Sequence, residues 1–433
     1  MKKALFWHRR DLRFDDNAGL YHAQKKADSV QAIFVFDTVI LDKLEKNDQR
    51  IIFIHQAIHA LKDAYQNYGG DLKVYYGNPQ KLVPQIAKEL KVDFVFTNRD
   101  YEPYALERDK YIFEKLAEQN IEFLGAKDHV IFEKSEIAKA DGLPYTIYTP
   151  YSRKWKEKLN EYFLSSYPNE KYSSKICQAK AEDLITLKEM GFDSEILVPF
   201  PTSDYASKFM KNYGENRNFP AIDKGTSHLG VHLRFGTISI RVLARQALKA
   251  NETFLNELIW RDFYQAIIYH FPHSVKGSFK KQYDAIEWRN GEVEFKAWCE
   301  GKTGYPMVDA GMRELNTTGY MHNRVRMVVA SFLVKHLLID WRWGETYFAE
   351  KLLDFDLASN VGGWQWAAGS GCDAAPYFRV FNPTAQLDKF DRKLEYVKTW
   401  IPEFGTDDYP EPIVEHKFAR ERVLARYKLG LNS

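Results

Sequence analysis

Short apolar runs alternate with longer stretches of helical periodicity over the first 125 residues. Runs of strand length occur at 4–7, 32–36, 73–75, 94–97 and 122–124. Residues 51–68 and 79–90, which lie between them, carry apolar side chains at helical spacing. Strands that alternate with helices pair in parallel through crossover connections. The pattern therefore predicts a doubly wound α/β domain over residues 1–125.

The alternation stops after residue 125. Residues 126–201 are charged, rich in tyrosine and interrupted by prolines, so we expect a long interdomain connection there. From residue 202 to residue 433 the strand signals vanish and helical periodicity takes over. A chain of 433 residues is also too long for one compact core. The sequence thus predicts two domains, of which the second, 202–433, is all-α.

Composition narrows the class of protein. Hydrophobic residues make up 45% of the chain, which is enough for a large core. The 61 Lys and Arg residues nearly balance the 59 Asp and Glu residues, so net charge does not indicate a nucleic-acid partner. The three cysteines form no CxxC pair, which argues against a disulfide framework and a thiolate zinc site. No apolar run is long enough for a signal peptide or a membrane span. We expect a cytoplasmic protein without a metal.

A helix without proline or glycine is predicted over residues 254–269. At about 100° per residue, four side chains share one of its faces. They are Glu257, Trp260, Arg261 and Tyr264. A stripe that mixes aromatic rings with charged groups is typical of the wall of a ligand pocket. A buried ion pair with two aromatic rings packed on it accounts for the same stripe, and the helix alone does not decide between the two.

Residues 319–338 repeat this pattern. Asn323 and Met327 lie one turn apart on one side of the predicted helix, and methionine packs well on planar ligands. Further along the chain, Trp364 and Trp366 are separated by a single residue. On a helix these two rings point about 200° away from each other, so we expect them to serve different purposes.

One stretch of the chain is strongly basic although the net charge of the whole chain is close to zero. Residues 224–251 hold no carboxylate but carry Lys224, Arg234, Arg241, Arg245 and Lys249. Such runs are usually solvated surface. Next to an aromatic pocket they also suit a phosphate backbone laid across the mouth of that pocket.

Several motifs, taken together and in order, make the sequence resemble the photolyase/cryptochrome family over nearly the whole chain. They are WHRRDLRFDDN at 7–17, ELIWR at 257–261, GYPMVDA at 304–310, GYMHNRVRM at 319–327, LIDWR at 338–342, GGWQWAA at 362–368 and DAAPYFRVFNP at 373–383. The resemblance implies FAD as cofactor, DNA with pyrimidine dimers as partner, and light-driven repair of cyclobutane dimers. It also implies a monomer that needs no protein partner.

Three details are similar to the class I cyclobutane dimer photolyases within this family. His322 and Asn323 stand where relatives that repair (6-4) photoproducts have His-His, and 364–366 keep a Trp-Gln-Trp that DASH-type cryptochromes lack. Asn360, which by resemblance faces flavin N5, is Asp in plant cryptochromes and Cys in animal ones. A cryptochrome-like photoreceptor and a (6-4) photolyase are the alternatives. The chain stops at Ser433, without the long signalling tail of many such receptors.

The resemblance assigns two groups of residues to FAD. Its phosphates and ribityl chain would be held by Tyr213, Thr226, Ser227, His228, Leu229 and Gly230. Gly230 stands where many relatives have Ser, so one hydroxyl contact is missing. The isoalloxazine would be surrounded by Arg261, Arg326, Asp354, Asp356 and Asn360, and Glu257, Tyr264 and Asn323 are also expected to bind the cofactor. Arg326 and Asp354 are expected to pair, because a reduced flavin anion needs nearby positive charge and hydrogen-bond donors.

The same resemblance assigns residues to the lesion. Glu257 and Asn323 match the groups that hydrogen-bond a flipped-out dimer. Its apolar walls would be formed by Trp260, Met327 and Trp366.

Electron transfer and DNA contact are assigned in the same way. A chain of Trp288, Trp341 and Trp364 would carry an electron from the surface to photo-oxidised flavin. Contacts to DNA are expected from Arg217, Arg324 and Gln386.

The identity of a second, light-harvesting chromophore stays open. Tyr104 and Ala105 stand where folate-binding relatives have Asn and Glu, and Val275 replaces a Cys that some of those relatives carry. The resemblance therefore leaves 5,10-methenyltetrahydrofolate, an 8-hydroxydeazaflavin, another flavin or no antenna as alternatives.

Overall fold

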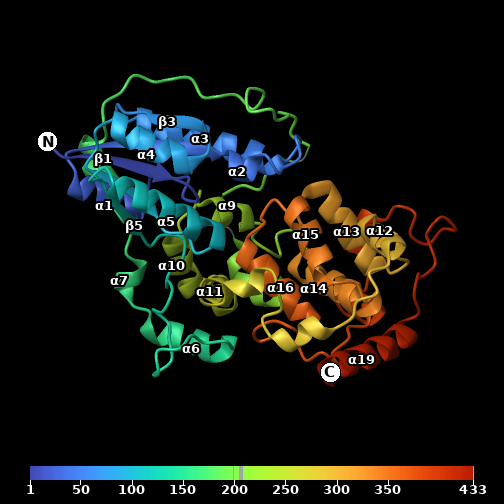
Figure 1. Ribbon diagram of the computed structural model, residues 1–433. Helices are drawn as coiled ribbons and strands as arrows, with labels where there is room; N and C mark the ends of the chain where they lie inside the picture. Colours follow the sequence, from blue (N-terminus) through green and yellow to red (C-terminus); the bar gives the residue numbers. More distant parts are fainter. Residues whose placement is uncertain (198, 204–207, 433) are drawn as a thin grey trace. The chain divides into compact units, whose positions relative to one another are not determined.

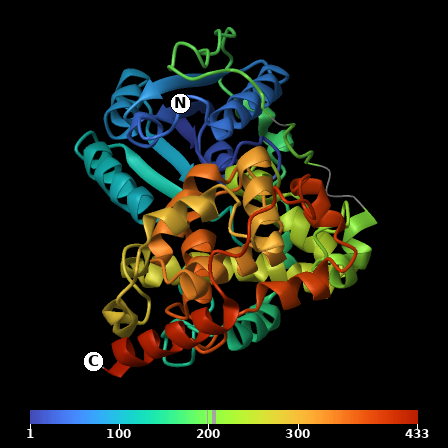
Figure 2. The same cartoon turned by 90° about the vertical axis from the view of Figure 1, so that its right-hand side faces the viewer.

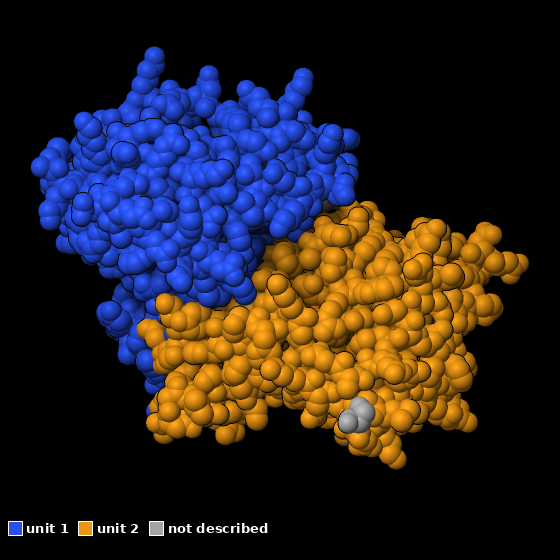
Figure 3. Space-filling model, viewed as in Figure 1, with its two compact units in different colours: residues 1–133, 157–205, 229–249 blue, residues 134–156, 206–228, 250–433 orange. Residues whose placement is uncertain are grey.

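The computed structural model of the protein describes residues 1–197, 199–203 and 208–432. Ser433, named above, lies outside the described residues. The chain divides into two compact units that interleave along the sequence (Figure 3). Unit 1 comprises 1–133, 157–205 and 229–249, and unit 2 comprises 134–156, 206–228 and 250–433.

Unit 1 is built on a five-stranded parallel sheet with strand order β3-β2-β1-β4-β5 (Figure 1). The strands are β1 (Lys3–His8), β2 (Ser29–Asp37), β3 (Leu72–Gly77), β4 (Phe94–Asn98) and β5 (Glu122–Ala126). All five strands expected from the sequence are confirmed, and most extend further than their apolar runs. The chain adds strands outward on one side of β1 and then on the other, so the doubly wound topology is confirmed as well.

Helices cover both faces of this sheet, because alternate side chains of each strand point to opposite faces. Phe6 of β1 packs in one core with α1 (Ala18–Lys26) and α3 (Gln49–Gln66). Leu5, its neighbour, packs in the other core with α4 (Pro79–Glu89) and α5 (Pro103–Ala117). The remaining helices of unit 1 are α2 (Thr38–Leu41), α7 (Glu161–Leu164), η1 (Asn169–Lys175), α9 (Gly230–Phe235) and α10 (Ile240–Ala250), the last ending at the unit boundary.

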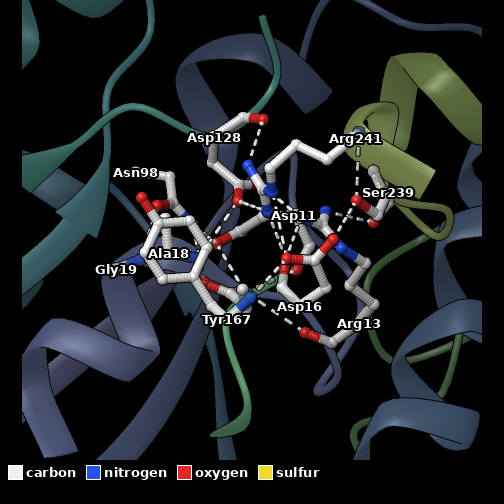
Figure 4. A network of polar contacts seen from close by, with 12 residues as sticks. Asp11, Arg13, Asp16, Ala18, Gly19, Asn98, Asp128, Tyr167, Ser239 and Arg241 are labelled. Atoms are coloured by element: carbon white, nitrogen blue, oxygen red, sulfur yellow. Dashed lines mark hydrogen bonds and ion pairs between the residues drawn. The ribbon is translucent and has the colours of Figure 1, made fainter. Parts of the chain in front are cut away.

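A buried polar network ties α10 to the loops of unit 1 (Figure 4). Arg241 donates from Nη2 to Oδ1 of Asp128 at 2.9 Å and from Nε to Oδ1 of Asp16 at 3.0 Å. Arg13 donates to the second oxygen of Asp128 at 2.7 Å. Burial alone would raise the pKa of Asp128, but Arg13 and Arg241 hold it well below its usual range. The expectation of an exposed basic run is therefore wrong for Arg241, which is 4% exposed and ion-paired.

Unit 2 is helical, and its described residues contain no β-strand. Its helices are α6 (Tyr148–Lys158, which runs past the unit boundary), η2 (Lys208–Asn212), α8 (Tyr213–Asn216), α11 (Glu252–His270), η3 (Pro272–Val275), η4 (Lys281–Ala285), α12 (Glu292–Cys299), α13 (Pro306–Thr318), α14 (Asn323–Ser331), η5 (Phe332–His336), α15 (Trp341–Lys351), α16 (Leu357–Ala368), α17 (Pro383–Phe390), α18 (Glu395–Trp400) and α19 (His416–Asn432). In Figure 2, α19 is the red helix that ends at the label C, and it packs on η4 and η5.

Two of these helices carry the stripes singled out in the sequence. The helix expected over 254–269 is confirmed as α11, and Asn251 caps its first turn by accepting the Phe254 N–H at 3.1 Å. The second helix begins only at Asn323, because Gly319 ends α13 in a left-handed conformation with φ 66° and His322 caps α14. From Phe332 it continues as one π-helical turn, η5. Within the described residues, every helix is too short or too polar to cross a bilayer.

Candidate functional site

A cavity of about 420 Å³ lies in unit 2 among α11, α14, α15 and α16. It is lined by Arg217, Glu257, Trp260, Arg261, Tyr264, Asn323, Arg326, Met327, Ala330, Phe348, Leu352, Asp354, Phe355, Asp356, Ser359, Asn360, Gly363, Trp364 and Trp366. Residues more than 140 positions apart in sequence thus meet in one concave site, as ligand pockets require. All the residues that the sequence assigns to the isoalloxazine and the lesion are among them.

Other assigned residues do not line this cavity. In unit 2 they are Tyr213, Thr226, Ser227, His228, Trp288, Arg324, Trp341 and Gln386. Leu229 and Gly230 belong to unit 1, where Gly230 begins α9. The functional roles of all these residues stay predictions.

On α11, Glu257 forms an ion pair with Arg217, the residue that ends α8. Burial raises the pKa of Glu257, and the Arg217 guanidinium opposes that rise without cancelling it. The carboxyl group therefore holds its proton to a higher pH than an exposed glutamate does. A half-buried acid of this kind can, when protonated, donate a hydrogen bond to a ligand oxygen in the cavity.

Trp260, one turn further along α11, has one face covered by another aromatic ring. Tyr148 of α6 stacks on it with ring centroids 3.7 Å apart and planes 2° from parallel. The Tyr148 hydroxyl donates to the Asn256 carbonyl at 2.9 Å. This contact joins a residue from the predicted interdomain connection to the predicted lesion wall. Sequence reasoning missed it because no local pattern links two positions 112 residues apart.

On the α14 side, Arg326 bridges two segments of the cavity wall. Its Nη2 donates to both oxygens of Asp354, at 3.0 and 3.2 Å, and its Nε donates to the Met321 carbonyl at 2.7 Å. Burial would lower the pKa of Arg326, but Asp354 more than offsets this and raises it. The guanidinium is therefore a fixed positive charge in the wall.

Tyr320 connects this wall to the stretch assigned to the FAD phosphates. Its hydroxyl lies 3.1 Å from Oγ1 of Thr226, and its ring centroid lies 4.2 Å from that of His228. The guanidinium carbon of Arg326 lies 5.7 Å from the same ring. The sequence analysis did not single out Tyr320, although it stands inside the 319–327 motif.

On α16, two polar side chains are held in fixed orientations. Asp356 caps the helix by accepting the Ser359 N–H at 3.0 Å, and it also accepts from Nε2 of Gln265 at 3.1 Å. Asn360 donates from Nδ2 to Oε1 of Glu345 at 2.9 Å and to the Glu345 carbonyl at 3.0 Å. Both amide hydrogens of Asn360 are thereby used, so its Oδ1 is the atom left to accept a hydrogen bond from a ligand.

The two tryptophans of α16 have different surroundings, as their spacing predicts. Trp364 is 2% exposed and meets Phe348 edge to face at 5.0 Å. It fits only because position 344 is glycine, where a Cβ would lie 2.1 Å from the indole ring. Trp366 is half-buried and lies 6.3 Å from Phe381, in the segment after the helix.

The cavity has features that fit a large planar cofactor with negative charge. Its lining combines the guanidinium groups of Arg217, Arg261 and Arg326 with aromatic rings and hydrogen-bonding side chains. Gly363 lines the cavity, and a Cβ added there would meet no atom within 4 Å. A ligand can therefore approach the backbone closely at this position. Beside the cavity lining, next to Asn323, Nε2 of His322 is buried and finds no partner among the described residues. The donor set therefore fits FAD.

Two family models match the chain. One, described as the FAD binding domain of DNA photolyase, matches residues 254–407, and so covers α11, α14, α15 and α16. The other, described as DNA photolyase, matches residues 4–170, which include the parallel sheet.

Curated relatives align along almost the full length. The deoxyribodipyrimidine photo-lyase of a Synechococcus species is 36% identical over 98% of this chain and 96% of the relative. The enzyme of that name from Escherichia coli K12 is 36% identical over 99% of both chains.

Solved structures share the fold. A class III photolyase from Agrobacterium tumefaciens superposes with a TM-score of 0.88 at 32% identity, covering 100% of this chain and 98% of the other. A photolyase from Sulfolobus tokodaii, whose structure holds two FAD molecules, gives a TM-score of 0.82 at 33% identity over 99% and 100%. A Synechocystis cryptochrome gives 0.83 at 25% identity over 98% and 99%.

Proposed function

Because this chain belongs to the photolyase/cryptochrome family, with FAD as its cofactor, we propose that it uses light to reopen cyclobutane pyrimidine dimers in DNA. The observation that carries the proposal is the cavity wall in which a half-buried acid with a raised pKa, Glu257, lies with Asn323 and the aromatic rings of Trp260 and Trp366. Such a wall suits a flipped-out pyrimidine dimer better than a small polar substrate, because it combines stacking surfaces with few, fixed polar groups.

FAD would be held by the residues of α11, α14 and α16 that face the cavity. Arg326, fixed by Asp354, supplies positive charge, and Asp356 and Asn360 supply oriented acceptors. Tyr213 and the stretch 226–230 are proposed to hold the phosphates and ribityl chain. When bound in its reduced form and excited by light, FAD supplies the electron that opens the dimer and takes it back.

The lesion would be recognised by stacking and by two hydrogen-bonding groups. Extruding a base from a duplex costs a few kcal/mol, and less when the base is already damaged. Stacking on an aromatic wall contributes about 1–3 kcal/mol per base, which offsets that cost. Trp260, Met327 and Trp366 would form this wall. The O–H of the protonated Glu257 carboxyl would donate a hydrogen bond to a dimer carbonyl oxygen, with the Asn323 amide beside it.

Entry of a dimer would change the partner of Glu257. In the structure this carboxyl is paired with Arg217. A neutral, protonated Glu257 interacts less with a guanidinium, so Arg217 becomes available to a DNA phosphate when the carboxyl turns to the dimer. Further DNA contacts are proposed for Arg324 and for Gln386 on α17. In the structure, Nη2 of Arg324 donates to Oδ1 of Asn218 at 2.7 Å.

Recovery of reduced flavin would proceed through a tryptophan chain. Trp364 and Trp341 are 2% and 1% exposed, and Trp288 is half-buried at the edge of the same hydrophobic core. A path from solvent to the cavity needs one accessible end and a buried interior, which this set provides. The monomeric state, the cytoplasmic location and the antenna chromophore stay predictions.

One experiment tests the proposal and separates it from its alternatives. The purified, reduced protein is illuminated with DNA that carries one defined thymine cyclobutane dimer, and restored thymines are counted against a dark control. A parallel reaction uses DNA with one (6-4) photoproduct. Repair of the cyclobutane dimer alone supports the proposal. Repair of the (6-4) photoproduct alone would show that the protein is a (6-4) photolyase instead. If neither lesion is repaired although the protein holds FAD, a photoreceptor role is favoured, since a solved cryptochrome shares the fold.

A further inference from the structure

His322 stands at the junction between α13 and α14, directly before Asn323 of the cavity wall. Its Nδ1 accepts the Arg324 backbone N–H at 3.1 Å and so caps α14. The side chain is 5% exposed. Its second nitrogen, Nε2, is buried and has no hydrogen-bond partner among the described residues. Buried polar atoms in folded proteins are almost always paired, so this atom calls for an explanation.

The cap fixes which nitrogen carries the hydrogen. Burial, together with the nearby arginines, lowers the pKa of His322 to about 4, so the ring is neutral near pH 7. A neutral imidazole holds one hydrogen, and the nitrogen that accepts a hydrogen bond is the bare one. Because Nδ1 accepts, Nε2 carries the hydrogen. The unpaired atom is therefore a buried donor that lacks an acceptor.

Positive charge surrounds this donor. The groups that act electrostatically on His322 are Arg326, His228, Arg324 and Arg217, and the three arginines among them have no acceptor. His228 in turn lies against Tyr320, whose hydroxyl meets Thr226. His322 thus borders the 226–228 stretch that the resemblance assigns to the FAD phosphates. A place with a spare donor and several cations suits an anionic acceptor.

We propose that Nε2–H of His322 donates a hydrogen bond to the adenosine diphosphate half of FAD, which makes His322 a cofactor-binding residue. The proposal rests on the binding of FAD and not on the repair of dimers. It also explains why a histidine caps α14. Asn or Ser caps a helix at least as well, but only a longer side chain presents a second donor on the far side of the cap.

Two substitutions separate the cap from the donor. His322→Asn keeps a capping acceptor and removes the far N–H. His322→Gln places an amide N–H near the position of Nε2 and loses the cap. Each full-length holoprotein is diluted in series, and the dissociation constant for FAD is obtained from the fluorescence of released flavin. We expect His322→Asn to raise this constant by roughly tenfold to a hundredfold, the range for a hydrogen bond to a charged group. His322→Gln should stay within about threefold of wild type.

Melting temperatures over a series of FAD concentrations give the second readout. Loss of the cap lowers the melting temperature at every FAD concentration, whereas loss of a ligand contact flattens its rise with FAD. His322→Gln is expected to show the first effect and His322→Asn the second. A variant damaged only in folding shows the first effect alone.

Two competitors locate the contact on the cofactor. ADP and riboflavin are titrated as displacers of bound FAD. In His322→Asn, ADP is expected to bind more weakly than in wild type, and riboflavin equally well. An unchanged FAD dissociation constant in His322→Asn overturns the proposal, with water as the partner of Nε2. If His322→Asn instead binds riboflavin more weakly and ADP as well as wild type does, the placement of the contact on the adenosine diphosphate half is wrong. Failure of wild type to repair dimer DNA while it still holds FAD overturns the proposed function and leaves this inference standing.

Discussion

Glu257 and Arg217 form an ion pair within the wall of the cavity, and the pKa of the carboxyl is nevertheless raised, because burial outweighs the guanidinium. The pair therefore holds an acid that is readily protonated when a neutral partner replaces Arg217. We expect Glu257→Ala to lower the quantum yield of dimer repair by roughly tenfold, the order expected for losing a hydrogen bond to a charged group. Flavin content, measured by absorbance, should stay at the wild-type level.

The pH dependence of repair tests which form of Glu257 acts. A raised pKa keeps the carboxyl protonated to higher pH than in an exposed glutamate, and the donor is lost as pH rises through that value. Wild-type yield should therefore fall with rising pH. Glu257→Gln keeps an N–H donor at every pH, so its yield should not change. A wild-type profile as flat as that of Glu257→Gln contradicts proton donation by Glu257.

Tyr148 gives a prediction about binding rather than chemistry. Its ring stacks on Trp260 with centroids 3.7 Å apart, which fixes the plane of the indole on which a lesion would stack. An aromatic pair contributes about 0.5–1.5 kcal/mol, so Tyr148→Leu should weaken binding of dimer DNA by about threefold to tenfold. The repair yield at saturating DNA should not change. Gel shift and fluorescence titrations with damaged and undamaged DNA measure the difference.

The matched control keeps the ring and removes the hydroxyl. Tyr148→Phe loses only the hydrogen bond to the Asn256 carbonyl and should bind dimer DNA like wild type. If Tyr148→Phe is as weak as Tyr148→Leu, the hydroxyl and not the stack positions Trp260.

The proposed electron-transfer chain of Trp288, Trp341 and Trp364 can be tested against an alternative route. Trp288→Phe should abolish photoreduction of oxidised flavin under blue light with an external electron donor. Repair by protein that is already reduced should be unchanged. Flavin absorbance during illumination measures the first, and dimer repair after chemical reduction measures the second.

The rival route runs through other rings that contact Trp364. Trp298 meets Trp364 at 6.1 Å, Phe295 stacks on Trp298 at 5.8 Å, and Trp343 meets Phe295 at 5.1 Å. Trp343 is partly buried against the same core as Trp288. Trp343→Phe is therefore the matched control and should photoreduce like wild type. If it loses photoreduction while Trp288→Phe keeps it, the electron reaches the flavin through Trp298.

Much of the fold could be predicted because its strands and helices follow from patterns among residues that are close in sequence. The five strands appear as apolar runs bounded by polar residues, and α11 appears as an uninterrupted helical period with Asn251 as its cap. Patterns of this kind depend on neighbours in sequence, which fix the backbone period and the buried face together. The start of α14 was expected four residues too early, because a histidine cap is a weak sequence signal.

The rest depends on contacts between distant residues. The sequence predicts that Arg241 belongs to a basic surface run, yet the residue is buried. Its charge is balanced by Asp16 and Asp128, which lie more than 100 residues away in sequence. Tyr148 reads as part of a connection, yet it packs on Trp260. Burial of a charge or a ring is decided by its tertiary partners, which no local window contains.

Glu314 is a further group of this kind, and it sets a pH dependence of stability. It lies on α13 and is 8% exposed. Its Oε2 accepts from the Tyr396 hydroxyl at 2.6 Å and from the His322 backbone N–H at 3.3 Å. Burial raises its pKa to about 7, although both hydrogen bonds oppose the rise.

Replacing Glu314 with Gln should remove this pH dependence. An acid whose folded pKa lies above its unfolded value stabilises the fold below the unfolded pKa, and that stabilisation is lost as pH rises through the folded pKa. For Glu314 the loss falls between pH 4.5 and about 7 and amounts to about 3 kcal/mol in the free energy of unfolding. Gln still accepts from Tyr396 and carries no charge. Urea unfolding should therefore find Glu314→Gln more stable than wild type at pH 8 and similar to it at pH 4.5. Equal differences at both pH values would mean that Glu314 keeps an ordinary pKa in the folded protein.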